Sequence, residues 1–482
     1  MSTDGIILGT WGKQYLQHRG PEHVLLFAPA RSGKGVGVIL PTLLTIGGSV
    51  LVHDIRGEAW EATAGYRQQI SHCAYFNPTH PQSIRINPLL EVRQGDKAVR
   101  DVQNLADIIT DPEGAQDHRD YWSRSGHALL VGAILHVLYA EPDKTLAGVA
   151  NFLSDPARPF TETLSVMMRT LHVHGQVHPV VATSARECLN KSTNELSGVL
   201  STAMSFLGLY RDPIVARATS ASDLRFMDLM HATNPVSLYL VVPPSDLSRT
   251  RPLIRLLLNQ MGRALTEDFA QKPHHPLLQV LDEFPAMGRL EFYQSSLAYL
   301  AGYQIRALLV AQSLNQLDNT YGPNNSLMDN CHVRVAFAPN DERTAKRISE
   351  LLGTATETRQ QASVSGGRFA LVLNHRSAST IVSPRPLLTP GEVLQFDPER
   401  AIILQAGHPP INARKIRHYT DPQLMARVLP PPDLRILDVP PSVPSPWLKE
   451  GPKPVLPAPT PETPAETEAA TLLLGIPRSP RP

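Results

Sequence analysis

The stretch FAPARSGKGVGVILPTLL, residues 27–44, constrains the fold of this chain more than any other part of it. Four apolar residues, Val24–Phe27, precede a loop of small residues that reaches Lys34 and Gly35, and an apolar helical pattern then runs to Leu44. In such a strand–loop–helix unit, successive backbone N–H groups and the helix N-terminus converge on phosphate, and the lysine reaches the terminal phosphate oxygens. The sequence therefore predicts a nucleotide site on an α/β sheet.

The loop departs from the usual pattern at two positions. Ala28 stands where a first glycine is usual, and Gly35 replaces the Ser or Thr whose hydroxyl normally binds Mg²⁺. Ser32, Asp282 or water must then bind the metal instead. Taken alone, this loop leaves open a glycine-rich turn that merely contains a lysine. We expect the ATP-binding loop to comprise Ala28, Pro29, Ala30, Arg31, Ser32, Gly33, Lys34, Gly35 and Val36.

A second apolar run, LLQVLDEF, ends in two acids and supplies the other half of such a site. Asp282 at the strand tip is expected to hold Mg²⁺, and Glu283 to polarise the attacking water. The next strand, IRALLVA, ends at Gln312, which is placed to contact the γ-phosphate or the water. Two half-sites in the right order predict ATP hydrolysis, with Lys34, Glu283 and Gln312 as catalytic residues.

Short apolar runs alternate with helical patterns such as Pro252–Phe269 and Thr344–Leu352. This alternation predicts an α/β fold with a mainly parallel sheet covered on both faces. Between residues 89 and 224 the patterns are almost all helical, which predicts an inserted all-α domain between two parts of the nucleotide-binding domain, 1–88 and 225–429. The expected strands are Val24–Phe27, Ser49–His53, Ser237–Val242, Leu277–Leu281, Ile305–Ala311 and Val333–Phe337.

From Pro430 the composition changes. Sixteen of the last 53 residues are proline, mixed with Ser, Thr, Glu and Ala, and such a segment buries too little apolar surface to fold. Residues 430–482 are therefore predicted to form a disordered tail. The short TLLLGIP within it is either a linker or a docking peptide, and a linker is the preferred interpretation.

Composition limits the remaining possibilities. The net charge is +1, so nucleic-acid binding would need a local patch or a ring-shaped channel. Three dispersed cysteines, Cys73, Cys188 and Cys331, favour a reducing compartment and buried thiols. A membrane span needs about 20 apolar residues, and the run from Ala128 to Ala140 is shorter and contains His136. We expect a chain that does not cross a membrane by itself.

With these residues in view, the chain resembles the type IV coupling proteins, the TraG/TraD-like ATPases of conjugation and type IV secretion. The likeness covers most of the chain from Gly5 to Tyr419. Six blocks carry it, in the order of the family: GPEHVLLFAPARSGKGVGVILPTLL, GSVLVHDIRGEAWEATAGYR, DEFPAMGRL, AGYQIRALLVAQSLNQL, AFAPNDERTAKRISELLGTAT and SPRPLLTPGEVLQFDPERAIILQAGHPPI.

The resemblance implies a RecA-like P-loop NTPase domain with an inserted all-α domain, assembled as a hexameric ring. It also implies delivery of a relaxase-bound single DNA strand, or of protein effectors, to a type IV secretion channel. Lys34 corresponds to the phosphate-loop lysine, Asp282 and Glu283 to the acidic pair and Gln312 to the sensor. Family members usually begin with a membrane-spanning segment ahead of the region matching Gly5, whereas this sequence starts almost at that region. We therefore expect a peripheral protein at the cytoplasmic face of the bacterial inner membrane.

Several alternatives stay open on the sequence. The cargo is either single-stranded DNA or protein effectors, and a site without the Gly35 hydroxyl could bind nucleotide without turnover in a structural adaptor. A chromosome-segregation pump of the FtsK kind is disfavoured by the six blocks. A neighbouring subunit in a ring should supply an arginine to the γ-phosphate. The candidates are Arg289, which is preferred for its place behind the acidic pair, and Arg306, Arg334 and Arg343.

Overall fold

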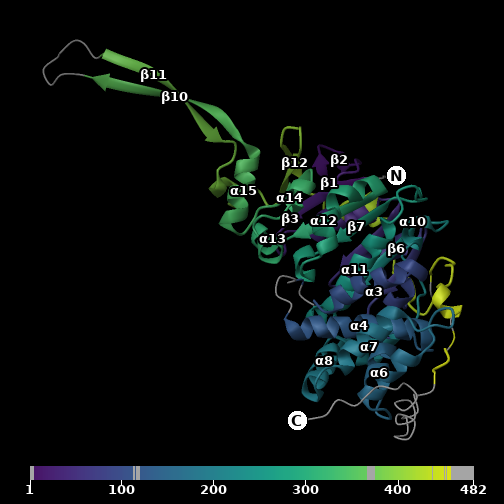
Figure 1. Cartoon of the computed structure of the whole chain (residues 1–482). Helices are drawn as coiled ribbons and strands as arrows, with labels where there is room; N and C mark the ends of the chain where they lie inside the picture. Colours follow the sequence, from purple (N-terminus) through teal and green to yellow (C-terminus); the bar gives the residue numbers. More distant parts are fainter. Residues whose placement is uncertain are drawn as a thin grey trace, which may run out of the picture.

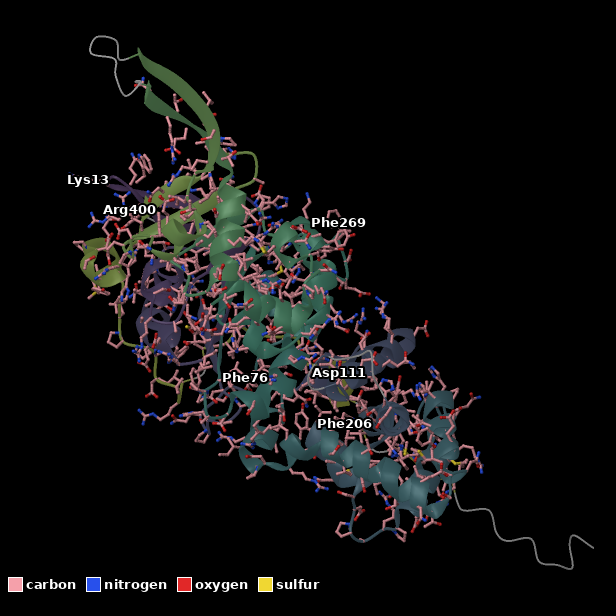
Figure 2. All side chains as sticks on the ribbon, turned by 90° about the vertical axis from the view of Figure 1, so that its left-hand side faces the viewer. Lys13, Phe76, Asp111, Phe206, Phe269 and Arg400 are labelled. Carbon is pink, nitrogen blue, oxygen red and sulfur yellow. The ribbon has the colours of Figure 1, made fainter. Side chains whose placement is uncertain are left out.

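The computed structural model describes residues 5–111, 114, 120–365, 375–436, 438–449, 451 and 453–456. Eleven strands form one sheet in the order β2-β1-β13-β12-β9-β3-β8-β7-β4-β6-β5. Figure 1 shows this sheet in the upper part of the molecule, with helices packed around it and a mainly helical part below. The molecule is elongated, with Lys13 and Arg400 towards one end and Phe206 towards the other (Figure 2).

Seven neighbouring strands, from β9 to β5 in the sheet order, are parallel. All six strands expected from the sequence are among them, with ends that agree within one residue, so the parallel α/β prediction is confirmed. These strands are β3 (Val24–Phe27), β4 (Ser49–Asp54), β5 (His72–Phe76), β6 (Val236–Val241), β7 (Leu277–Leu281), β8 (Ile305–Ala311) and β9 (Val333–Ala336).

Four antiparallel strands continue the sheet beyond β9, and none of them was predicted. Two pairs of strands, each joined by a short turn, bring together the first residues of the chain and a segment almost 400 residues later. Pairing of this range has no local signal in the sequence. The strands are β12 (Arg400–Gln405), β13 (Ile411–Arg414), β1 (Ile6–Trp11) and β2 (Gln14–His18).

Alternate residues of the buried strands face two different cores, as the two-residue period of a strand requires. Leu25 and Leu51 belong to the core that continues into the helical part, and Leu26 and Val52 to the core on the opposite face. Outside the helical part, the sheet is accompanied by α2 (Glu58–Arg67), α11 (Leu247–Leu265), α12 (Glu291–Leu300), α13 (Leu314–Tyr321), α14 (Leu327–Asn330), α15 (Glu342–Leu352), α16 (Pro390–Leu394) and α17 (Pro422–Met425).

The helical part follows β5 and precedes β6, which fits the inserted all-α domain. Its long central helix α4 (Tyr121–Ala140) is buried along most of its length and contacts α7 and α8. Around it lie α3 (Ala98–Ile109), α5 (Leu146–Leu153), α6 (Phe160–Arg169), α7 (Pro179–Leu189), α8 (Thr193–Phe206), α9 (Pro213–Ala218) and α10 (Asp228–His231). The boundaries 89 and 224 remain a prediction. In the described residues no helix is both long enough and apolar enough to span a bilayer.

Two expected helices differ in detail. Helix α11 begins at Leu247, so Pro252 lies inside it and does not mark its start. The helix after the phosphate loop begins as a π-helical segment, η1 (Gly35–Ile39), and continues as α1 (Leu40–Leu43). Pro41 accounts for the wider turn, because its ring would clash with the carbonyl four residues earlier and it has no N–H to donate.

A long two-stranded hairpin, β10 (Thr354–Ser365) and β11 (His375–Pro386), projects from the body beside α15 (Figure 1). We call residues 354–365 and 375–386 the arm. The Leu387 N–H donates to the Gly353 carbonyl at 2.9 Å and closes the base of the arm. The arm was not predicted because its strands are rich in Ser, Thr and Gln and their sequence lacks an alternating apolar pattern.

The start of the disordered tail at Pro430 remains a prediction, and residues beyond it contact the body. The described residues between 430 and 456 run along the body, and Trp447 is fully buried. Its indole Nε1–H donates to the Val92 carbonyl at 2.6 Å, and its ring meets Tyr139 edge-on at 4.8 Å. Other contacts hold the same segment, since Asp438 accepts from the Cys73 N–H and the Ser445 hydroxyl donates to the Leu90 carbonyl. Residues 457–482, with TLLLGIP, lie outside the described residues.

Near Trp447, three histidines form a hydrogen-bonded chain in the helical part. The backbone N–H of His178 donates to His172 Nδ1 at 3.2 Å, so the hydrogen of neutral His172 is on Nε2. That nitrogen donates to His136 Nδ1 at 2.9 Å, and His136 Nε2 in turn faces the Glu141 carboxylate at 3.3 Å. Burial, with His136 and His178 nearby, lowers the pKa of His172 to about 3.

Stability should therefore fall as the pH drops below about 6.5. The unfolded chain takes up a proton on His172 near pH 6.5, whereas the folded protein keeps it neutral down to about pH 3. Between pH 6.5 and pH 5 this linkage removes roughly 1.5–2 kcal/mol from the free energy of unfolding. Denaturant unfolding at the two pH values should show a smaller loss in His172→Asn, whereas the exposed control His408→Asn keeps the parent's pH dependence. Equal loss in all three proteins would contradict this assignment.

Candidate nucleotide site

The candidate site lies at the carboxyl ends of three adjacent parallel strands. Strands β3, β8 and β7 are neighbours in the sheet, and the phosphate loop, Gln312 and Asp282 follow them directly. Because parallel strands present their carboxyl ends on one edge, these groups converge although they lie almost 280 residues apart in the chain. The sequence prediction that Lys34, Asp282, Glu283 and Gln312 belong together agrees with this placement.

Lys34 is at the centre of the cluster. Its Nζ lies 2.8 Å from Asp282 Oδ1 and also contacts Glu283 Oε1, to which Gln312 Nε2 donates at 2.9 Å. Burial disfavours the charge of Lys34, but the two carboxylates outweigh it and raise the pKa of the lysine. The cluster thus pairs one lysine with two carboxylates, and the third N–H of the Lys34 ammonium is available to a bound phosphate.

Glu283 is held in an unusual backbone conformation. Its φ is 51°, in the left-handed region that non-glycine residues rarely occupy, at a typical cost of about 1–3 kcal/mol. Its own N–H donates to Asp282 Oδ1 at 3.0 Å. This turn between β7 and the short 3₁₀ helix η6 (Phe284–Met287) directs the carboxylate towards Lys34 and Gln312. Strain of this kind is commonly retained where a side chain must be placed for function.

The phosphate loop itself has the features of an anion cradle. Gly33 has φ 88° and the exposed Arg31 has φ 62°, so the chain curls tightly before Lys34. Within the described residues, the N–H groups of Gly33 and Lys34 donate to no backbone carbonyl. Ala28 is buried at the end of β3, and its N–H donates to the Ala311 carbonyl at 2.9 Å, which ties the loop to β8. Pro29 is buried, Ala30 is exposed, and Gly35 and Val36 begin η1.

The residues present fit a nucleotide with a bound Mg²⁺. Ser32 Oγ is buried and has no hydrogen-bond partner among the described residues, although a buried hydroxyl normally has one. Together with the carboxylate of Asp282, it provides the hard oxygen donors that Mg²⁺ prefers. The set of loop, lysine and acids therefore includes oxygen ligands for the metal without a hydroxyl at Gly35.

Arg289, the preferred trans-acting arginine, is half-buried and does not contact this cluster. Its Nε donates to Gln294 Oε1 at 2.9 Å. Arg306 is buried near the amino end of β8, on the opposite edge of the sheet, and Arg334 donates to the Met328 carbonyl. Arg343 pairs with Asp318 at 2.5 Å but is 53 % exposed. Which arginine serves a neighbouring subunit stays a prediction.

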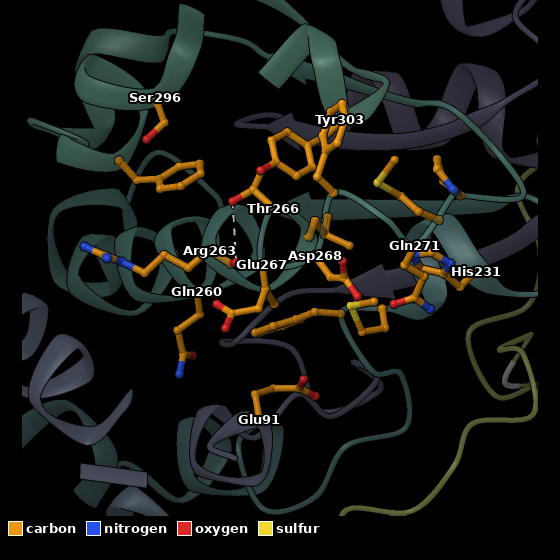
Figure 3. A pocket seen from close by; sticks show the side chains of 18 of the residues that line it. Glu91, His231, Gln260, Arg263, Thr266, Glu267, Asp268, Gln271, Ser296 and Tyr303 are labelled. Carbon is orange, nitrogen blue, oxygen red and sulfur yellow. Dashed lines mark hydrogen bonds between the residues drawn. The ribbon is translucent and has the colours of Figure 1, made fainter. Parts of the chain in front are cut away.

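A cavity of about 990 Å³ lies away from the site, at the amino ends of β7 and β8 (Figure 3). Glu267 on its wall accepts ion pairs from Lys97, Arg93 and Arg100, which lower the pKa of the carboxyl to about 2. Glu267 is thus held by basic side chains of the same chain. The loop, Lys34 and the acidic pair lie at the opposite edge of the sheet from this cavity.

Comparison with known proteins gives the family. The family model described as type IV secretory system conjugative DNA transfer matches residues 3–435. The chain belongs to this family.

Two curated relatives show how far the likeness extends. The conjugal transfer protein TraG of Escherichia coli is 41 % identical over 465 residues, which cover 89 % of this chain and 73 % of TraG. Protein VirD4 of Agrobacterium fabrum is 31 % identical over 439 residues, 86 % of this chain and 61 % of VirD4. Membership of the conjugative DNA transfer family, with the loop and acidic pair described above, makes the protein a P-loop ATPase of type IV secretion.

Solved structures agree on the fold. The unbound conjugative coupling protein TrwBdeltaN70 superposes with a TM-score of 0.64 at 16 % identity, covering 86 % of this chain and 88 % of that one. TrwB in complex with ADP and Mg²⁺ gives a TM-score of 0.60, also at 16 % identity, over 82 % and 86 % of the two chains. The RecA-like fold with an inserted all-α region, expected from the sequence, is confirmed for this member of the family.

Two residues of the site were missed by sequence analysis. His53 at the end of β4 is fully buried, and its Nδ1–H donates to the Asp282 carbonyl at 2.9 Å, next to the acidic pair. Lys415, after β13, reaches the phosphate loop from the far end of the chain. A histidine at a strand end and a lysine in a basic segment resemble ordinary surface residues until the sheet brings them to the loop. In this member of the conjugative transfer family, only the three-dimensional structure identifies them.

Proposed function

We propose that this protein is an ATP-hydrolysing coupling protein that delivers a relaxase-bound single DNA strand to a type IV secretion channel. The observation that carries the proposal is the meeting of Lys34, Asp282, Glu283 and Gln312 beyond three adjacent strands, in a chain of the conjugative DNA transfer family. The arrangement of these four residues supports ATP hydrolysis, and membership of the family supports a role in type IV secretion. The relaxase and the channel components are proposed partners.

Each residue of the site has a separate role in the proposed hydrolysis. The N–H groups of the phosphate loop and Lys34 bind the phosphates, and Ser32 Oγ and Asp282 would hold Mg²⁺, which when bound neutralises phosphate charge. Once phosphate replaces it as partner of Lys34, Glu283 is free to accept a proton from water. Gln312, which donates to Glu283 in this structure, reports the state of that carboxylate to β8 and α13.

A ring is proposed as the working assembly. An arginine from a neighbouring subunit would complete the site, and Arg289 and the exposed Arg343 are the candidates at the correct edge of the sheet. We place the assembly at the cytoplasmic face of the inner membrane, where channel components would receive the cargo.

The test is the ATPase rate as a function of protein concentration, with and without single-stranded DNA. A self-assembling DNA motor should show a specific rate that rises with concentration, because the trans arginine is present only in the assembly, and that rises again with DNA. Double-stranded DNA of equal length is the matched control. A concentration-dependent rate that ignores DNA would favour protein effectors as cargo, and no turnover at any concentration would leave a nucleotide-binding adaptor.

A further inference from the structure

The segment that follows β13 contacts the phosphate loop on the side away from Lys34. Lys415 Nζ donates to the Ser32 carbonyl at 3.0 Å and lies over the Phe337 ring, 3.6 Å from its centroid. The next residue, Ile416, is buried, and its carbonyl is 3.1 Å from the place that a Cβ would take at Gly37. The contact spans 383 residues of sequence and joins β13 to the loop that follows β3.

The contact between Lys415 and the Ser32 carbonyl affects the orientation of the next N–H group, that of Gly33. In a trans peptide the C=O of one residue and the N–H of the next are fixed in one plane and point in opposite directions. A cation that holds the Ser32 carbonyl outward therefore turns the Gly33 N–H inward, beside Lys34. That N–H donates to no backbone carbonyl within the described residues, as expected of a group reserved for phosphate.

We propose that Lys415 is a positioning residue of the nucleotide site, which orients the Ser32–Gly33 peptide so that its N–H faces the phosphates. The inference deepens the proposed function and rests on it for the identity of the ligand. Lys415 does not touch the nucleotide in this role and acts through the loop.

The surroundings of Lys415 hold its ammonium in place. Phe337 follows β9, and its N–H donates to the Phe27 carbonyl at 2.9 Å, so the aromatic ring is fixed at the base of the loop. The backbone N–H of Lys415 donates to the Glu399 carbonyl at 2.8 Å. Arg417, two residues on, pairs with the Glu399 carboxylate in an exposed ion pair. It carries the same charge in the same segment without reaching the loop, which makes it the matched control.

The experiment is calorimetric titration of the full chain with Mg-ADP, for the parent, Lys415→Met, Lys415→Arg and Arg417→Met. Lys415→Met should bind Mg-ADP about tenfold more weakly, as expected for loss of one hydrogen bond that involves a charged group. Lys415→Arg, which keeps a cationic donor over the ring, should bind within about threefold of the parent, and Arg417→Met should match the parent. In ATPase assays Lys415→Met should raise KM with little change in kcat, because the loop holds ground state and transition state alike.

The outcomes separate this inference from the function on which it rests. Parent protein that binds no Mg-ADP would overturn the nucleotide site itself. Parent-like affinity in Lys415→Met would overturn only the role of Lys415, as would an equal loss in Arg417→Met. If Lys415→Met melts well below the parent, the deciding comparison is Lys415→Arg against Lys415→Gln: rescue by arginine alone supports positioning, and equal affinity of the two overturns it.

Discussion

Glu283→Gln should lower the rate of ATP hydrolysis by about 10²–10⁴-fold, the contribution typical of a general base. The substitution keeps the size of the side chain but removes its negative charge and its capacity to take a proton from water. Nucleotide affinity should stay equal or increase, because the Glu283 carboxylate contacts Lys34 and competes with phosphate for it. Steady-state hydrolysis and Mg-ADP titration on the same preparation measure the two effects separately.

Lys34→Ala is the companion variant for this prediction. It removes the cation from both carboxylates and from the phosphates, so affinity and rate should fall together. The pair of variants thus distinguishes binding from chemistry at two side chains that touch each other. A Glu283→Gln protein that hydrolyses ATP at a rate close to that of the parent would rule out this residue as the base and direct attention to other groups at the strand ends.

Trp447→Ala should reduce the free energy of unfolding by about 3–5 kcal/mol, the usual cost of removing a large aromatic side chain from a core. Trp447 is 0 % exposed, packs edge-on against Tyr139 and donates to the Val92 carbonyl. Its loss leaves a cavity beneath residues 438–449 and leaves the Val92 carbonyl without this donor. Denaturant unfolding of the full chain measures the change.

Trp11 offers a matched control in the same protein. It is 62 % exposed at the end of β1, so Trp11→Ala should change the free energy of unfolding by no more than about 0.5 kcal/mol. Equal stability of Trp447→Ala and the parent would mean that the segment around Trp447 does not contribute to the folded core. A loss confined to Trp447→Ala would establish that ordered structure continues past the predicted boundary at Pro430.

Much of the fold could be predicted because buried parallel strands are short continuous apolar runs in the sequence. Val24–Phe27 and Leu277–Leu281 agree with the structure residue for residue. The antiparallel strands could not be predicted in the same way, since β1 pairs with β13 across some 400 residues and β13 has exposed side chains. The arm shows the limit most clearly, because its polar sequence has no apolar period to detect.

The residues of the candidate site also differ in how far they could be predicted. Lys34, the acidic pair and Gln312 follow apolar strands directly, and the topology of a parallel sheet guarantees that such strand ends meet. Lys415 belongs to no motif, and its role depends on the path of the chain after β12, which local patterns do not encode. The burial of Trp447 could not be predicted for a related reason, because composition averages over many residues and does not register one side chain.

The arm has a mechanical consequence. Its strands are 12 residues long, which corresponds to about 40 Å at about 3.3 Å per residue. Its base follows α15 directly, and the Thr344 hydroxyl on that helix accepts the Leu314 N–H, two residues beyond Gln312. A rigid rod of this length turns a rotation of about 10° at the base into a displacement of about 7 Å at the far end of the strands. A small rotation of α15 would therefore be enlarged several-fold at the far end of the arm, and α15 is joined to the segment after Gln312 by a hydrogen bond.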